Sequence, residues 1–121
     1  MIDRDEVENA YHTVAWAICE GRRRLGKDLI RSINTVITDS SGRIDEIRAR
    51  EKELGEQIAN GDNHMKSNLN ICFEMHGEYL NIVRGMKELK KFPRNFYNTP
   101  RADTLCSQMA KYLIPSTDCH P

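Results

Sequence analysis

A heptad pattern between Asp62 and Lys91 constrains the fold of this chain more than any other feature. Its members follow one another in alternating steps of four and three: Met65, Leu69, Cys72, His76, Tyr79, Val83 and Met86. This spacing places the side chains on one stripe of a helix, and an apolar stripe has to be covered by a neighbouring helix. Only the middle member, His76, is not apolar. The stretch therefore predicts a long helix over 63–91 in an all-α protein.

The residues before this helix predict two others. Asp3 is placed to cap a first helix whose apolar stripe continues to Val36, so we expect one long helix over 3–37. Gly21 and Gly26 interrupt this stretch and leave a division into two helices as the alternative. Turn-forming residues over 38–42 separate it from a second helix over 42–60. The short connection to 63–91 predicts that the second and third helices form an antiparallel hairpin.

The remaining residues predict a short C-terminal helix. Phe92-Pro93 ends the long helix, and Thr99-Pro100 begins a fourth helix over 100–113. The aromatic link between them, which includes Phe96, is expected to hold this helix against the bundle rather than to stack on bases. We therefore expect a single domain over 1–115, followed by a loose tail over 116–121.

The composition favours self-association. Apolar residues make up 39% of the 121 residues, below the roughly 45–50% that is usual in folded domains. A small polar helical chain buries only part of its surface by itself. Together with the heptad pattern, this predicts a coiled-coil-like homodimer that forms through the hairpin or through the first helix.

Charge is balanced overall but concentrated in two basic rows. The chain has 18 basic and 18 acidic residues, so its net charge gives no attraction to nucleic acid or membranes. The rows lie in the first helix and at the end of the third: Arg22, Arg23, Arg24, Lys27 and Arg31, then Arg84, Lys87, Lys91 and Arg94. We favour solvated faces that pair with acidic residues of this chain or of a protein partner. If the two helices were parallel, the rows would merge into a phosphate-binding patch.

The cysteines and histidines give a weak metal signal. Cys72 and His76 are four residues apart on one helical face, which is half of a zinc site. We favour a structural role for His76, and a pH-sensitive contact is a further possibility. The four cysteines are widely spaced, show no C-x-x-C pair and follow no secretion signal, so we expect reduced thiols in the cytoplasm.

The sequence shows no recognisable constellation of catalytic residues. It also has no nucleotide-binding loop and no apolar run long enough to cross a membrane. We therefore expect a non-enzymatic helical interaction protein without a cofactor: a small inhibitor, adaptor or regulator of a macromolecular partner, such as phages and plasmids use as accessory factors. Nucleic-acid binding through the basic rows is the alternative, and a zinc-dependent helical protein is a third hypothesis.

Overall fold

The structure, a computed structural model, describes residues 3–21, 25–97 and 100–111. These residues contain helices and no strand, which confirms the all-α class. The elements are α1 (Arg4–Cys19), α2 (Lys27–Ala59), the short 3₁₀ helix η1 (Asn63–Met65), α3 (Lys66–Lys91), α4 (Pro93–Phe96) and α5 (Pro100–Lys111).

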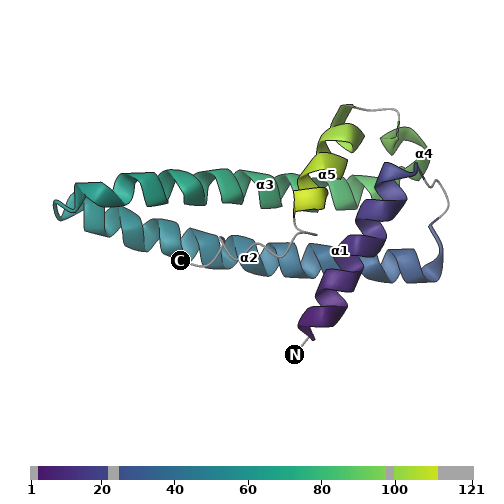
Figure 1. Cartoon of the computed structure of the whole chain (residues 1–121), viewed down its shortest axis with the longest axis horizontal. Coiled ribbons are helices and arrows are strands. Elements are labelled where there is room, and N and C mark those ends of the chain that lie inside the picture. Colours follow the sequence, from purple (N-terminus) through teal and green to yellow (C-terminus); the bar gives the residue numbers. More distant parts are fainter. Residues whose placement is uncertain (1–2, 22–24, 98–99, 112–121) are drawn as a thin grey trace.

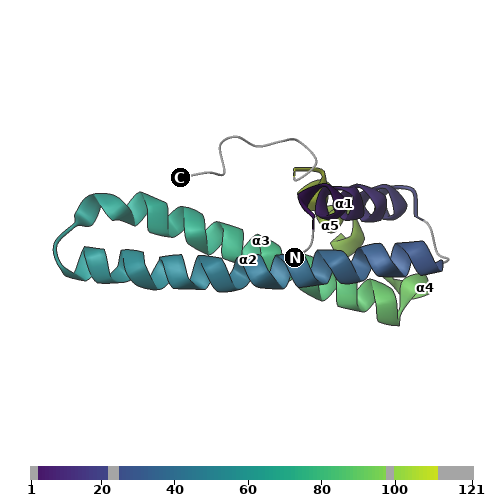
Figure 2. The same ribbon diagram turned by 90° about the horizontal axis from the view of Figure 1, so that it is seen from below.

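The long helices α2 and α3 form the body of the molecule and lie side by side (Figure 1). The chain reverses direction between them at Gly61, whose φ of 100° lies in the left-handed region that glycine adopts readily. The helices α1, α4 and α5 gather toward the opposite end of the pair, with α1 and α5 on one side of it (Figure 2). Near the turn, no other described α-helix lies beside α2 and α3 (Figure 1), and we call this part, residues 44–78, the arm.

The single helix predicted over 3–37 is wrong, because the chain breaks at its glycines. The last turn of α1 is closed by hydrogen bonds from the backbone N–H of Glu20 and Gly21 to the carbonyls of Trp16 and Ile18. Gly21 then adopts a φ of 69°, the left-handed conformation that commonly ends a helix. The chain turns away here, and α2 begins at Lys27.

The turn predicted over 38–42 is also wrong, because α2 passes through it without a break. Ser40 is fully buried, and its hydroxyl lies 2.8 Å from the hydroxyl of Tyr11 in α1. Its neighbours along the stripe, Val36 and Ile44, are buried as well. Packing against another helix thus outweighs the turn preference of this polar segment. The second helix accordingly runs over 27–59 rather than 42–60.

The core lies where α1, α2, α3 and α5 meet. The largest side chains that are fully buried there come from all four helices and from the link: Val14, Ile33, Val36, Ile82, Met86, Leu89, Phe96, Leu105 and Met109. Gly85 lets α5 approach α3 closely, since a Cβ atom on it would lie 2.5 Å from Cδ2 of Leu105. Phe96 is only 1% exposed, so the aromatic link packs into the bundle.

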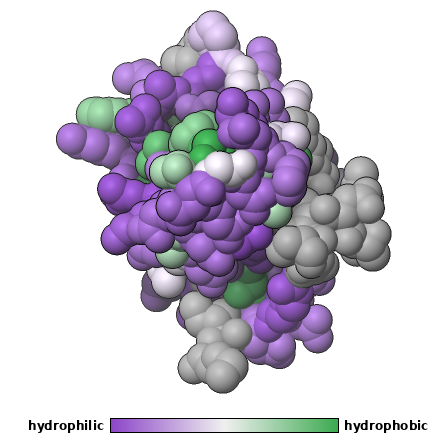
Figure 3. Space-filling model, turned by 90° about the vertical axis from the view of Figure 1, so that its left-hand side faces the viewer, coloured by the Kyte–Doolittle hydropathy of each residue, from purple (hydrophilic) through white to green (hydrophobic). Residues whose placement is uncertain are grey.

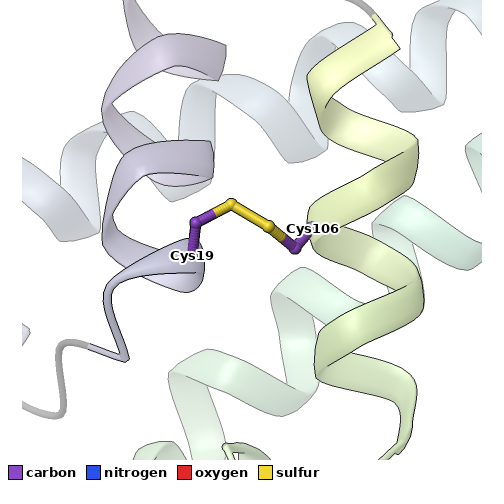
Figure 4. Close-up of a disulfide and its surroundings, with 2 residues drawn as sticks. All are labelled: Cys19 and Cys106. Atoms are coloured by element: carbon purple, nitrogen blue, oxygen red, sulfur yellow. A yellow bond between two sulfur atoms is a disulfide. The ribbon is translucent and has the colours of Figure 1, made fainter.

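A disulfide between Cys19 and Cys106 joins the end of α1 to α5 (Figure 4). The two Cα atoms lie 5.6 Å apart although 87 positions separate them in the sequence. The expectation of reduced thiols is therefore wrong for this pair, which only the folded chain brings together. Cys72 is a free thiol, and Cys119 lies outside the described residues. Among the described helices, none combines the length and apolar character that crossing a bilayer requires.

Candidate interaction surfaces

A buried polar network fixes α1 across α2. The hydroxyl of Tyr11 donates to Oδ2 of Asp39 at 2.7 Å and lies 2.8 Å from Oγ of Ser40. Nε of Arg43 donates to the same Asp39 oxygen at 2.9 Å, and its guanidinium lies 5.8 Å from the centre of the Tyr79 ring. Burial raises the pKa of Tyr11 above its ordinary value, so this hydroxyl stays protonated. The network positions helices and contains no activated group.

His76, the middle member of the heptad pattern, lies in the contact between α3 and α2. Its Nδ1 is 2.8 Å from Oε1 of Glu51, and the two side chains are 24% and 14% exposed. Burial raises the pKa of the nearby Cys72, which disfavours the thiolate that a nucleophile or a zinc ligand requires. Within the described residues, no cluster of three or more metal-ligating side chains forms. Cys72 and His76 thus gain no third ligand in this part of the chain.

The described residues of the two basic rows lie toward the same end of the molecule (Figure 1), which the sequence did not predict. Lys27 and Arg31 are exposed on the first turns of α2, while Arg84, Lys87, Lys91 and Arg94 are exposed on α3 and α4. A hydrogen bond of 2.6 Å from Nζ of Lys90 to Oδ1 of Asn34 shows that these two helix ends adjoin. Because Lys27 and Arg31 belong to α2 and not to the first helix, they share this end of the molecule with the C-terminal turns of α3 although the helices are not parallel. Arg22, Arg23 and Arg24 lie outside the described residues.

The arm carries apolar side chains that no described helix covers. Ile71 and Phe73 are each 53% exposed, and their spacing of two residues places them about 200° apart around α3. Figure 3 faces the turn end of the molecule and shows apolar groups on an otherwise hydrophilic surface. The contact between α2 and α3 in the arm is well packed only in part: Leu54 is fully buried, whereas Ile58 and Leu69 are half-buried.

A second surface that sequence reasoning missed surrounds Trp16. This side chain is 60% exposed and borders a hollow of about 570 Å³ between α1 and the first turn of α2. The hollow is also lined by His12, Thr13, Ala17, Gly26, Lys27, Asp28 and Leu29. Trp16 stands two positions from both Val14 and Ile18 of the buried stripe, a spacing that already places it on the opposite face of the helix.

Comparison with protein-family models, curated proteins and solved structures finds no match to this chain. Its function therefore has to be inferred from its own surfaces.

Proposed function

We propose that this chain is a non-enzymatic helical interaction protein, which acts as a homodimer and uses its arm to bind a protein partner as an inhibitor, adaptor or regulator. The observation that carries this proposal is the exposure of Ile71 and Phe73, 53% each, on the arm, where no other described α-helix lies beside α2 and α3 (Figure 1). Contiguous exposed apolar surface marks interaction sites in soluble proteins, and support for a partner therefore depends on the apolar stripe that Ile71 continues.

The stripe that contains Ile71 supports a helical partner. Ile71, Met75, Ile82 and Leu89 share one face of α3 by steps of four and seven residues. Ile82 and Leu89 are fully buried and flank Gly85, where α5 packs. Met75 is half-buried and Ile71 is exposed, so the stripe continues along the arm beyond the cover that α5 supplies. An amphipathic helix of a partner would extend that cover, as in other helix-in-groove complexes.

Site-specific photocrosslinking tests the proposal. A photoreactive phenylalanine analogue at position 71 should form a covalent adduct with a single protein of the native host, and excess unlabelled protein should suppress that adduct. The same analogue at Asp103, an exposed position of α5, serves as the control. The purified partner should then bind the Ile71→Glu variant at least about tenfold more weakly. Equal labelling from positions 71, 73 and 103 would remove the support for an interaction arm.

Nucleic-acid binding is the second candidate, favoured by the position of the described cations of both basic rows toward one end of the molecule. Labelled DNA and RNA should then bind more tightly at low salt, because cations on the protein displace counterions from phosphate. The double variant Lys87→Glu, Lys91→Glu should weaken this binding and flatten its salt dependence. An absence of binding at low salt would exclude this function.

The location of the protein stays a prediction. The sequence predicts the cytoplasm, whereas the Cys19–Cys106 disulfide favours an oxidising compartment, where such bonds persist. Rapid alkylation of thiols in intact host cells distinguishes the two, because only a reduced pair would be labelled before denaturation and reduction.

A further inference from the structure

A stripe on the flank of α3, outside the heptad pattern, carries residues that would complement the same stripe on a second copy of the chain. Its residues recur at steps of three and four, and we call them the flank stripe: Lys66, Asn70, Phe73, Gly77, Leu80, Arg84, Glu88 and Lys91. All are exposed except Leu80 and Glu88, which are half-buried. The stripe is apolar or small in its centre and polar at both ends, which is the usual composition of an interface core and its rim.

Gly77 at the centre of the flank stripe leaves room for another helix. It is exposed, and a Cβ atom built on it would meet nothing within 4 Å. Phe73 stands four residues before it and Leu80 three residues after it, so the two apolar side chains flank a position without a side chain. The distance between two packed helix axes depends on the side chains at their contact. A glycine between two large apolar residues therefore suits a close crossing.

We propose that a second copy of this chain packs its α3 antiparallel against the flank stripe, around a twofold axis at Gly77. In such an isologous contact, residues that are equally far from Gly77 in opposite directions face each other, and every contact is made twice. Phe73 of each copy then lies over Leu80 and Asn81 of the second copy. Both exposed rings are covered by this single arrangement.

The charges of the flank stripe favour this direction. Asn70 and Arg84 are both seven residues from Gly77 and face each other. Lys66 at eleven residues faces Glu88, whose Oε2 also accepts a hydrogen bond of 2.8 Å from Arg101 of α5. Lys91 at fourteen residues lies beside Asn63 and the neighbouring Asp62 of the second copy. Each cation thus meets an amide or a carboxylate. A parallel dimer would instead place Arg84 and Lys91 against their own copies, which is unfavourable.

The size of the contact sets the affinity. The 26 residues of α3 extend for about 39 Å, and a strip of about 10 Å width along them covers roughly 400 Å² per copy. This is about half of the area per partner in a standard stable interface. We therefore expect a reversible dimer with a dissociation constant in the micromolar range or above.

Sedimentation of three proteins tests the interface. The wild-type chain should form a dimer at concentrations of roughly 10–200 μM, around the expected dissociation constant. Phe73→Glu should weaken it about a hundredfold or more, because two carboxylates would enter the core of the contact. Ile71→Glu is the matched control, since Ile71 has the same 53% exposure on the same helix but points to the other flank. A wild-type chain that stays at 14.0 kDa throughout, or equal effects of the two variants, would overturn the proposal.

A charge exchange tests the direction of the helices. Asn70→Lys should weaken the dimer severalfold by facing Arg84 of the second copy, and Arg84→Glu added to it should restore the dimer or strengthen it. In a parallel dimer each substituted residue would face its own copy, so no rescue would follow. This inference rests on the proposed interaction role, but the two fail separately. A monomer that still forms the partner adduct at position 71 overturns only the dimer, and a dimer without that adduct overturns only the partner.

Discussion

The disulfide between Cys19 and Cys106 should supply a large share of the stability of this protein. It closes a loop across a sequence separation of 87. In the loop-closure model, the entropy that the unfolded chain loses raises its free energy by about 4–5 kcal/mol at 25 °C. A domain of 121 residues has a free energy of unfolding of roughly 6–18 kcal/mol. The double variant Cys19→Ser, Cys106→Ser should therefore lose between a quarter and most of this free energy.

Urea denaturation followed by circular dichroism measures the effect. Because the apolar contacts of α5 remain, the double variant should still fold and should unfold at a lower urea concentration. The wild-type protein in a strong dithiol reductant should show the same midpoint as the double variant. Cys72→Ser is the control, since it removes a half-buried free thiol and should cost about 1 kcal/mol or less.

A small effect would refute this reasoning. If the double variant and the wild type differ by less than about 1 kcal/mol, α1 and α5 are held together by their packing alone, and the loop-closure estimate does not apply. An unchanged wild-type midpoint in reductant, together with a destabilised double variant, would instead assign the loss to the serine side chains.

Three further predictions concern the packing of α1 and α5. Gly85→Ala should lower the free energy of unfolding by about 1–3 kcal/mol, because the new methyl group would collide with the buried Leu105, as thermal denaturation would show. Gly42→Ala, at an exposed position of α2 where a Cβ atom meets nothing within 4 Å, should not. Tyr11→Phe should cost about 1–3 kcal/mol in urea denaturation, because Asp39 loses a buried donor. Burial raises the pKa of Tyr11, so the folded state holds this proton more tightly than the unfolded chain does. Stability should be unaffected below the usual pKa of about 10 and fall above it, and a pH series of melts should show a smaller fall in Tyr11→Phe.

Much of the helical content could be predicted from the sequence, because its local signals agree with the packing. The heptad pattern over 63–91 corresponds to η1 and α3, and Phe92-Pro93 ends the long helix as expected. Asp3 caps α1 through a hydrogen bond from the backbone N–H of Asp5 to its side chain. In these places propensity, caps and apolar periodicity all favour the same structure.

The division of the first 60 residues could not be predicted by composition alone. Gly21 and Gly42 both lie in segments that suit a turn, but only Gly21 takes the left-handed conformation. The difference lies in what the neighbouring residues bury. Ser40 continues the stripe between Val36 and Ile44 because Tyr11, far away in the sequence, supplies a hydroxyl partner. The disulfide depends on the same long-range arrangement, which cysteine spacing does not reveal.

The break at Gly21 between α1 and α2 decides how the proposed functions relate to one another. Because Lys27 and Arg31 belong to α2, the described residues of both basic rows lie toward the end of the molecule opposite the turn, and the exposed apolar groups of the arm lie nearer the turn (Figure 1). The proposed antiparallel dimer would bring each basic end alongside the arm of the second copy and would cover Arg84 and Lys91. Phosphate binding by the same cations would compete with that contact, so DNA at low salt should dissociate the dimer if both occur. A dimer that persists on saturated DNA would mean that the phosphates contact other cations, such as Lys27 and Arg31.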